Sequence, residues 1–406
     1  MNVVKFDPRR YKERFLNWRF KGSPMPNISE DSRQLILNYI ADMEIGININ
    51  PSSRKGSRTY CSLQGIRTKM LLITELLEKE LGIHSLVELE SKELELLKFF
   101  KKMREGGFNK KYMQEPITGT GIYVTIIKAF WHWYQRVRRK NGVDVKDITV
   151  DLDATMIKPR FNYFTIKQLK MLGHESNYFY RILMWFMFDS GIRSPTELMN
   201  VRISDLEWNK EDKYYFLNIR EETSKTFGRK IKLLLCSEIL QNYIKYLNLK
   251  PETYLFRRDP HQLNQYLKNI GYKTLKIGTP TEKTYKGRKY TTVVDGLTMY
   301  DFRHSAACFW LQRYKSETAL KYRFGWKKSE MIEYYTSYAG MQDTITKEDL
   351  IAEDGKFPLE RELRIMDIEK IIMEERMEAA KRDMEEMNLR AKAIRETAEK
   401  TKLFNF

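Results

Sequence analysis

Cysteine and histidine are scarce in this chain of 406 residues. Its three cysteines, Cys61, Cys236 and Cys308, lie far apart, and neither they nor the five histidines match the spacing of a metal or redox motif. We therefore exclude disulfide-stabilised secreted proteins and zinc-binding modules as classes. The composition predicts no metal, no cofactor and a reducing, cytoplasmic compartment.

The chain also lacks a hydrophobic run long enough to cross a bilayer. Its most apolar run, from Tyr178 to Phe188, is about half the required length and contains Arg181. We interpret this run as a buried helix. The amino-terminal stretch lacks the apolar segment of a signal peptide. These observations predict a protein without a membrane partner.

Positive charge, in contrast, is abundant. Lysine and arginine number 72 against 54 aspartate and glutamate residues, which gives a formal net charge of +18. Residues 356–402 hold 12 basic and 12 acidic side chains, so the whole excess belongs to the remainder of the chain. An excess of this size predicts a polyanion or an acidic membrane surface as the partner.

The amino-terminal part of the sequence predicts an arm followed by a helical domain. Residues 1–25 are basic with interleaved aromatic residues, an arm that either docks by its rings or contacts DNA. In residues 26–143 apolar side chains recur at helical spacing. We expect helices near residues 29–46, 62–81, 86–103 and 121–139. Ser29 or Asp31 is the expected cap of the first helix, and the basic loop at residues 53–58 suits contacts with phosphate.

A second domain is expected over residues 160–350, opening with a helix that Thr165 caps. Two helices lead into three β-rich stretches separated by turns, then into a helix at residues 237–247. The β-rich stretches are residues 201–207, 214–220 and 229–235. The turn before the third presents Lys225 at a hairpin tip. Residues 271–296 predict a loop rich in lysine, threonine and tyrosine.

Residues 356–406 differ in kind from the rest. Methionine and alanine recur at heptad spacing from Met366 to Ala398. We expect a long helix that either pairs with a neighbouring subunit as a coiled coil or folds back on its own chain. Taken together, the segments predict a mainly α protein with a small antiparallel β-sheet, built from a helical domain, an α+β domain and a carboxy-terminal helix.

The stretch from residue 297 to residue 338 holds the residues with the clearest chemistry. It contains Arg303 and His304, a Gly325-Trp326 pair and two adjacent tyrosines, with further basic residues between them. An arginine fork binds phosphate oxygens in a bidentate manner. A phenol becomes a nucleophile when a positive field favours its anion. The alternative is an amphipathic aromatic helix that only packs its rings inward.

The motifs in this stretch resemble those of the tyrosine recombinase (phage integrase) family, in particular its archaeal members. Residues 300–305 (YDFRHS) stand for the family's H-x-x-R motif, and residues 324–326 (FGW) stand for its L-G-H motif. The intervals of 23 residues from Arg303 to Trp326 and of 9 from Trp326 to Tyr335 also resemble the family's spacing. Tyr334 is one residue short of that spacing.

Two upstream motifs extend the resemblance. The sequence around Arg193 is similar to the family's G-x-R-x-x-E-L motif, with Glu197 four residues after the arginine where the family usually has three. The family keeps its catalytic lysine on a β-hairpin, and Lys225 has that setting here. Arg229 and Lys230 remain alternatives for this role.

The resemblance implies a helical core-binding domain before the catalytic domain, and it implies a catalytic set. That set is Arg193, Lys225, Tyr300, Arg303, Trp326 and Tyr335. Tyr335 is the implied nucleophile, the arginines bind the phosphate, and Lys225 protonates the leaving oxygen. Trp326 stands where histidine is more usual and donates a hydrogen bond without titrating. Tyr300 is a poor base near neutral pH, so the general base stays open, with His304 as a candidate.

The function that the resemblance implies is site-specific recombination of double-stranded DNA through a 3′-phosphotyrosine intermediate, by a tetramer assembled on paired sites. This activity implies a protein that associates with the nucleoid. A relaxing topoisomerase or a resolvase with the same chemistry is one alternative. A DNA-binding regulator without catalysis is the second alternative.

Overall fold

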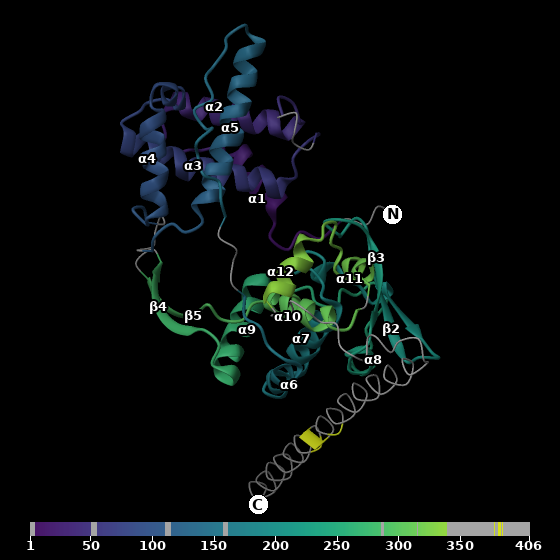
Figure 1. The fold of residues 1–406 in the computed structure, drawn as a ribbon. Helices are drawn as coiled ribbons and strands as arrows, with labels where there is room; N and C mark the ends of the chain where they lie inside the picture. Colours follow the sequence, from purple (N-terminus) through teal and green to yellow (C-terminus); the bar gives the residue numbers. More distant parts are fainter. Residues whose placement is uncertain are drawn as a thin grey trace, which may run out of the picture. The chain divides into compact units, whose positions relative to one another are not determined.

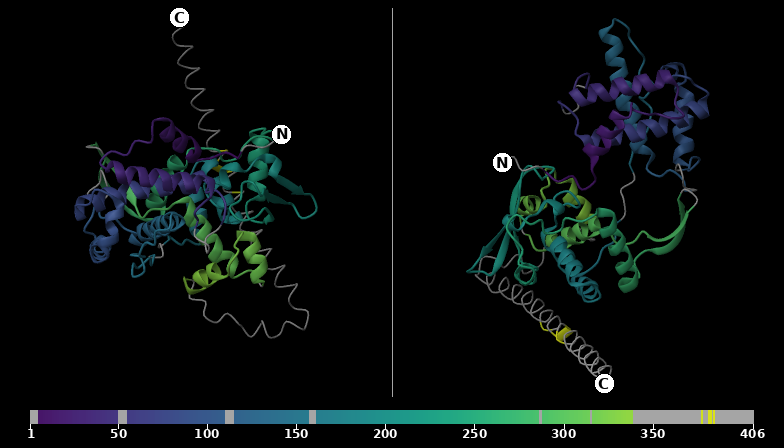
Figure 2. Two further views of the ribbon diagram at one scale, coloured as in Figure 1. Left: turned by 90° about the horizontal axis from the view of Figure 1, so that it is seen from above. Right: turned by 180° about the vertical axis from the view of Figure 1, so that it is seen from behind.

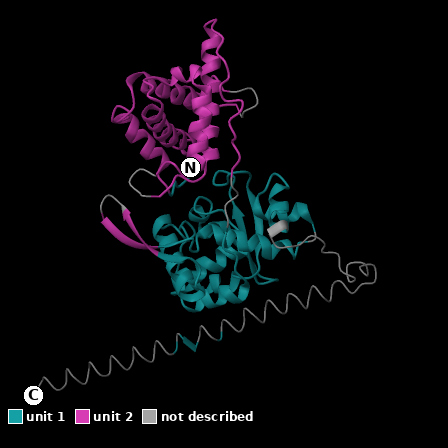
Figure 3. Cartoon of the chain, turned by 60° about the vertical axis from the view of Figure 1, so that its left-hand side comes forward, with its two compact units in different colours: residues 1–8, 161–280, 293–406 teal, residues 9–160, 281–292 magenta. Residues whose placement is uncertain are grey.

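The computed structural model describes residues 5–49, 55–109, 115–156, 161–285, 288–314 and 316–338, together with residues 377, 381, 382 and 384. The chain forms two compact units (Figure 1 and Figure 3). Residues 9–160 with 281–292 (magenta in Figure 3) are here the first unit, and residues 1–8, 161–280 and 293–406 (teal in Figure 3) are the second. The expected carboxy-terminal helix lies outside the described residues apart from four positions, and so do residues 53 and 54 of the expected basic loop.

The first unit is helical. Its elements are α1 (Tyr11–Phe20), α2 (Glu30–Ile45), α3 (Tyr60–Leu81), η1 (Leu86–Ser91), α4 (Glu93–Arg104) and α5 (Thr120–Lys140). The Ser29 side chain accepts a hydrogen bond from the Ser32 N–H and caps α2, as expected. Gly46 ends the helix with a φ of 92°. The predicted helix over residues 86–103 is wrong in one respect, because Lys92 separates a 3₁₀ turn from α4.

The amino-terminal stretch does not stand apart as an arm of 25 residues. Helix α1 packs against α3, with Phe15 fully buried and Trp18 nearly so. The ring of Phe15 lies 5.8 Å from that of Tyr60 at the start of α3. Phe15 and Trp18 therefore belong to the core of the helical unit, whereas Phe20 is exposed, and the expected boundary moves toward the amino terminus.

The second unit combines helices with two small sheets. Its elements are α6 (Ile166–His174), α7 (Tyr178–Ser190), η2 (Leu198–Asn200), η3 (Ile203–Asp205), β1 (Leu206–Asn209), β2 (Tyr214–Ile219), β3 (Arg229–Leu233), α8 (Ser237–Tyr246), α9 (Pro260–Leu275), β4 (Thr279–Tyr285), β5 (Arg288–Val294), α10 (Met299–Leu311), α11 (Glu317–Phe324) and α12 (Glu330–Tyr338). The greater part of the β4–β5 hairpin, residues 281–292, clusters with the first unit. Thr165 and Gln168 form a capping box at the start of α6, as expected for the cap.

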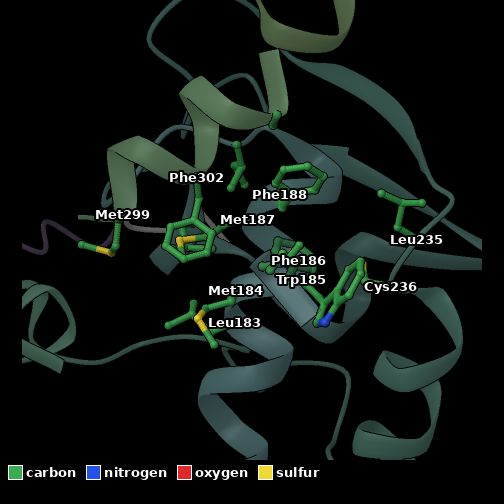
Figure 4. Packing of buried hydrophobic residues seen from close by; sticks show 14 of the residues in the cluster. Leu183, Met184, Trp185, Phe186, Met187, Phe188, Leu235, Cys236, Met299 and Phe302 are labelled. Carbon is green, nitrogen blue, oxygen red and sulfur yellow. The ribbon is translucent and has the colours of Figure 1, made fainter. Parts of the chain in front are cut away.

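Helix α7 is the centre of this unit's core. Its side chains are buried all round from Ile182 to Ser190, which is what the long apolar run predicted. Figure 4 shows these side chains between Met299 and Phe302 of α10 on one side and the segment after β3 on the other. Because residues 182–190 are enclosed by other elements, packing fixes the carboxy-terminal end of α7.

The three-stranded sheet is antiparallel in the order β1-β2-β3 (Figure 1 and Figure 2). Buried and exposed side chains alternate along β3, as the period of a strand requires. The first predicted strand was placed too early, since residues 203–205 form a 3₁₀ turn and β1 begins at Leu206. The predicted loop over residues 271–296 is also wrong, because it contains the end of α9 and the β4–β5 hairpin.

Candidate active site

The turn after α7 carries Arg193. Gly191 ends the helix in the left-handed region with a φ of 58°, and a Cβ at this position would lie 2.3 Å from the ring of Phe324. Glycine is therefore required both by the backbone conformation and by the approach of α11. The Arg193 side chain is 15% exposed and lies next to the end of α11.

The end of α11 receives that arginine. Gly325 ends α11 with a φ of 63°, and its carbonyl oxygen accepts hydrogen bonds from Arg193 Nη2 at 2.6 Å and from Thr226 Oγ1 at 2.9 Å. Thr226 lies in the loop between β2 and β3. One carbonyl group thus joins the turn after α7, the β2–β3 loop and α11.

Beneath this turn lies a buried carboxylate, Glu197, with 2% of its surface exposed. It accepts hydrogen bonds from Arg193 Nη1 at 2.8 Å and from Arg229 Nη2 at 2.8 Å, and from the Ser224 hydroxyl at 3.0 Å. Burial acts to raise the pKa of Glu197, but the hydrogen bond and charge of Arg229, with the charges of Arg193 and Arg303, lower it to about 2. Glu197 is therefore ionised and fixes the guanidinium of Arg193.

Arg303 lies on α10 and is almost fully buried. It donates hydrogen bonds to the carbonyl oxygen of Gly191 and, at 2.7 Å, to that of Phe324. Burial and the nearby charge of Arg193 lower the pKa of Arg303 to about 10, so it remains charged near neutral pH. Because the same turn and the same helix end hold both arginines, two positive charges are brought together.

Tyr335 of α12 is 1% exposed and its hydroxyl lies 2.6 Å from His304 Nδ1. Its ring stacks on Trp326, with centroids 5.4 Å apart and an interplanar angle of 18°. Burial raises the pKa of Tyr335 well above its ordinary value, although the charge of Arg303 acts in the opposite direction. The expected lowering of the phenol pKa is thus absent here, because desolvation outweighs the positive field.

Tyr300 and Lys225 are the exposed members of the predicted set. Tyr300 lies one turn before His304 on α10, with 48% of its surface exposed and its ring 5.2 Å from the imidazole. Lys225 is exposed in the β2–β3 loop, where the hairpin was predicted. With the described residues it forms no hydrogen bond or ion pair. Arg229 and Lys230, which compete with Lys225 for the acid role, are both engaged, since Arg229 pairs with Glu197 and Lys230 pairs with Glu207.

Arg193, Arg303 and Tyr335 thus contact residues 324–326, which include Trp326. Tyr300 and Lys225 lie at the margin of this group. The structural role of Arg229 was not predicted from the sequence. The alternation of side chains along β3 indicates this role. Arg229 lies on the buried face with Ile231 and Leu233, whereas Lys230 and Lys232 lie on the exposed face.

Within the described part of the chain, no group of three or more histidine, cysteine, aspartate or glutamate residues could hold a metal ion. None of the helices in those same ranges is long and apolar enough to cross a bilayer.

Comparisons with known proteins identify the fold. No family model matches the chain, and no curated protein matches its sequence. Among solved structures, a lambda integrase dimer bound to a COC′ core site matches with a TM-score of 0.51 and 14% identity, covering 85% of each chain. A dimer of lambda integrase residues 75–356 on the same site has a TM-score of 0.51 and 17% identity, covering 78% of this chain and 99% of that one.

A lambda integrase tetramer bound to a Holliday junction also matches, with a TM-score of 0.51 and 15% identity, over 82% of this chain and 83% of that one. These neighbours confirm the fold class that the sequence predicted, a mainly α chain with small antiparallel sheets. The resemblance to archaeal members stays a prediction. The chain has the tyrosine recombinase fold, as lambda integrase does.

Proposed function

We propose that this chain is a site-specific DNA recombinase of the integrase type, which cuts and rejoins strands through a 3′-phosphotyrosine link at Tyr335. One observation carries the proposal. Arg193, Arg303 and Tyr335 are far apart in the sequence, yet all three lie against the Phe324-Gly325-Trp326 segment. A phosphodiester seated there meets two guanidinium groups and a phenol.

The two arginines form the phosphate site. Each guanidinium carries five N–H donors, and the hydrogen bonds to protein acceptors use three in Arg193 and two in Arg303. Further donors remain for non-bridging oxygens of DNA. Because these groups are held before the substrate arrives, they stabilise the charge that develops in the transition state. Loss of one such donor costs on the order of 3 kcal/mol of transition-state stabilisation.

In the proposed cleavage, the Tyr335 oxygen attacks phosphorus and the bond from phosphorus to the 5′ oxygen breaks. Lys225 supplies the proton that this oxygen takes up, which its exposed position on the β2–β3 loop permits. Trp326 supports the Tyr335 ring and offers its indole N–H to the phosphate, and Tyr300 borders the site. Attack by a 5′-hydroxyl reverses the step. The phosphotyrosine link conserves the bond energy, so the chemistry calls for no cofactor.

The partner that we propose is double-stranded DNA. The net charge of +18 supports it, and two of the similar structures are lambda integrase on a COC′ core site and on a Holliday junction. Strand exchange between two duplexes needs four active sites, so we infer four copies on paired sites. Such a protein works on DNA in the cytoplasm and associates with the nucleoid.

A trapping experiment tests the function. The full chain is incubated with sheared genomic DNA of its source, the reaction is stopped with detergent, and protein that stays attached to DNA is digested and analysed by mass spectrometry. We expect a nucleotide adduct on Tyr335. Tyr335→Phe should abolish the adduct while DNA affinity stays the same. Tyr334→Phe is the matched control, because Tyr334 is adjacent but only partly buried.

The outcomes separate the candidate functions. An adduct that persists in Tyr335→Phe and disappears in Tyr334→Phe would move the nucleophile by one residue. Tight DNA binding without any adduct would favour a regulator over an enzyme. The trapped DNA also supplies the target sequence. Two duplexes that carry it should exchange strands, whereas relaxation of supercoiled DNA without exchange would indicate a topoisomerase.

A further inference from the structure

His304 lies where the proton of Tyr335 has to go. Its Nδ1 atom is 2.6 Å from the Tyr335 hydroxyl oxygen, a distance that allows direct proton transfer. The two side chains face each other from α10 and α12, which pack together. We propose that His304 is the general base, which accepts the Tyr335 proton as the hydroxyl attacks DNA. This inference rests on the proposed function.

Both rings of the pair are held in place. The imidazole of His304 stacks on Phe161, with centroids 4.3 Å apart and an interplanar angle of 15°. The phenol ring of Tyr335 stacks on Trp326. Rotation of either ring would sacrifice a stacking contact as well as the hydrogen bond. The atoms that exchange the proton are therefore oriented before substrate binds, which is what an efficient proton transfer requires.

Other groups near the phenol suit the role less well. Tyr300 is a phenol and is exposed, so it is a poor proton acceptor near neutral pH. The buried Cys308 thiol has its pKa raised to about 11 by desolvation and stays protonated. His304 has the position, and in the tautomer that carries its proton on Nε2 the Nδ1 atom presents a lone pair to the Tyr335 hydroxyl.

The protonation state of His304 fits this role. Burial and then the charge of Arg303 lower the pKa of His304 to about 4, so near neutral pH the imidazole is neutral. The groups that face it are Tyr300 and Arg303 on α10, Tyr334 and Tyr335 on α12, and the untitratable Phe161 ring. The positive charge of Arg303 disfavours protonation of His304. A phosphate anion bound to Arg303 offsets this charge and makes protonation of His304 more favourable. Deprotonation of Tyr335 is thereby linked to the arrival of DNA.

The step balances in protons and electron pairs. The Tyr335 proton moves to His304 Nδ1 while the phenol oxygen bonds to phosphorus, and the departing 5′ oxygen takes a proton from Lys225. In rejoining, the attacking 5′-hydroxyl returns a proton to Lys225. The phenol oxygen then leaves phosphorus and recovers its proton from His304. No further reactant is required.

The test separates the base from the acid. Cleavage is followed in a single turnover with a duplex that carries the trapped sequence, either with an ordinary phosphodiester or with sulfur in place of the 5′ bridging oxygen. The thiolate leaving group needs no proton. We expect His304→Gln to slow cleavage of both substrates about 100-fold. Lys225→Ala should slow only the ordinary phosphodiester. His261→Gln, the same change at an exposed histidine of α9, is the matched control.

The pH profile provides a readout that a purely structural role would not change. With wild-type protein, adduct formation should be nearly independent of pH from about 6 to 9, because His304 is already neutral. With His304→Gln, the rate should rise about tenfold per pH unit, because solvent must then remove a proton from a phenol with a raised pKa. Imidazole added to His304→Ala should restore part of the rate by filling the space beside Phe161.

Three results would overturn the proposal. They are an unchanged rate in His304→Gln, a pH profile parallel to that of the wild type, and a loss in His304→Ala that imidazole leaves unaltered in a folded protein. Failure of the proposed function is distinct, because the wild type itself would then form no adduct. Circular dichroism on each variant verifies that the comparison is made between folded proteins.

Discussion

Arg229 and Glu197 form a buried ion pair joined by two hydrogen bonds. Arg229 Nη2 lies 2.8 Å from Oε2 and Nη1 lies 3.3 Å from Oε1, and the two side chains are 0% and 1% exposed. Arg229 Nε also donates to the Arg323 carbonyl oxygen at 2.9 Å. This pair therefore connects the start of β3 to the turn that carries Arg193 and to the end of α11.

Removing Arg229 should destabilise the protein strongly. In Arg229→Ala the Glu197 carboxylate loses one of its two ion-pair partners and keeps Arg193. A buried charge that loses its partner costs about 3 to 5 kcal/mol in the free energy of unfolding. Lys230→Ala is the matched control, because Lys230 is the next residue and its pair with Glu207 is exposed. That change should cost less than about 1 kcal/mol. Urea denaturation measures both, and equal losses would contradict the structural role of the pair.

The same carboxylate should make stability depend on acid pH. The folded protein lowers the pKa of Glu197 from 4.5 to about 2, so the unfolded chain binds this proton more readily. The stabilisation is fully present above pH 4.5 and disappears as the pH falls toward about 2, an effect of roughly 3 kcal/mol. Glu197→Gln lacks this titration. Urea denaturation between about pH 6 and 3 should show the gap between wild type and variant shrinking, and a constant gap would count against the assignment.

Much of the site could be predicted because local rules determine it. Gly191 and Gly325 end helices, and glycine after an apolar-periodic run is a familiar stop signal. Arg193 and Trp326 follow those glycines and were predicted from the resemblance of their surroundings to the family's motifs. Thr165 was likewise identified as a cap from its position before the first apolar turn.

What could not be predicted depends on tertiary packing. The hydrogen bond between His304 and Tyr335 exists because α10 and α12 pack side by side, and no sequence period encodes that contact. Burial at this contact also raises the phenol pKa, which reasoning from arginine charge alone had inverted. The β4–β5 hairpin was missed because its lysines and threonines have the composition of a loop, although four consecutive β-branched residues, 291–294, end it.

Lys225 and Lys230 should differ in catalysis although both are exposed basic residues of the same hairpin. If Lys225 protonates the leaving oxygen, Lys225→Ala should reduce formation of the Tyr335 adduct about 100-fold or more. Lys230→Ala should leave it unchanged, because Lys230 Nζ is bonded to Glu207. Adduct formation on gels, with DNA affinity measured in parallel, makes the comparison. A larger loss in Lys230→Ala than in Lys225→Ala would transfer the acid role to Lys230.

Gly325 should be needed for catalysis beyond its backbone conformation. A Cβ at this position would lie 2.9 Å from Arg229 Nη1 and 3.0 Å from Arg193 Nη1, so Gly325→Ala should displace the phosphate-binding arginine. Gly82 is a matched control, because it ends α3 with a φ of 62° where Gly325 has 63°, and a Cβ there meets no atom within 4 Å. Both alanine variants should lose about 1 kcal/mol of stability through backbone strain, and Gly325→Ala should lose more because Arg229 must also shift.

Only Gly325→Ala should also slow adduct formation at Tyr335, by about 100-fold, since a displacement of about 1 Å in a positioning group has effects of that size. Urea denaturation and the trapping reaction measure the two effects separately. Because the strain is common to both variants, any difference in adduct formation reports the arginines. Equal adduct formation by the two variants would mean that Arg193 is not held in its working position by the end of α11.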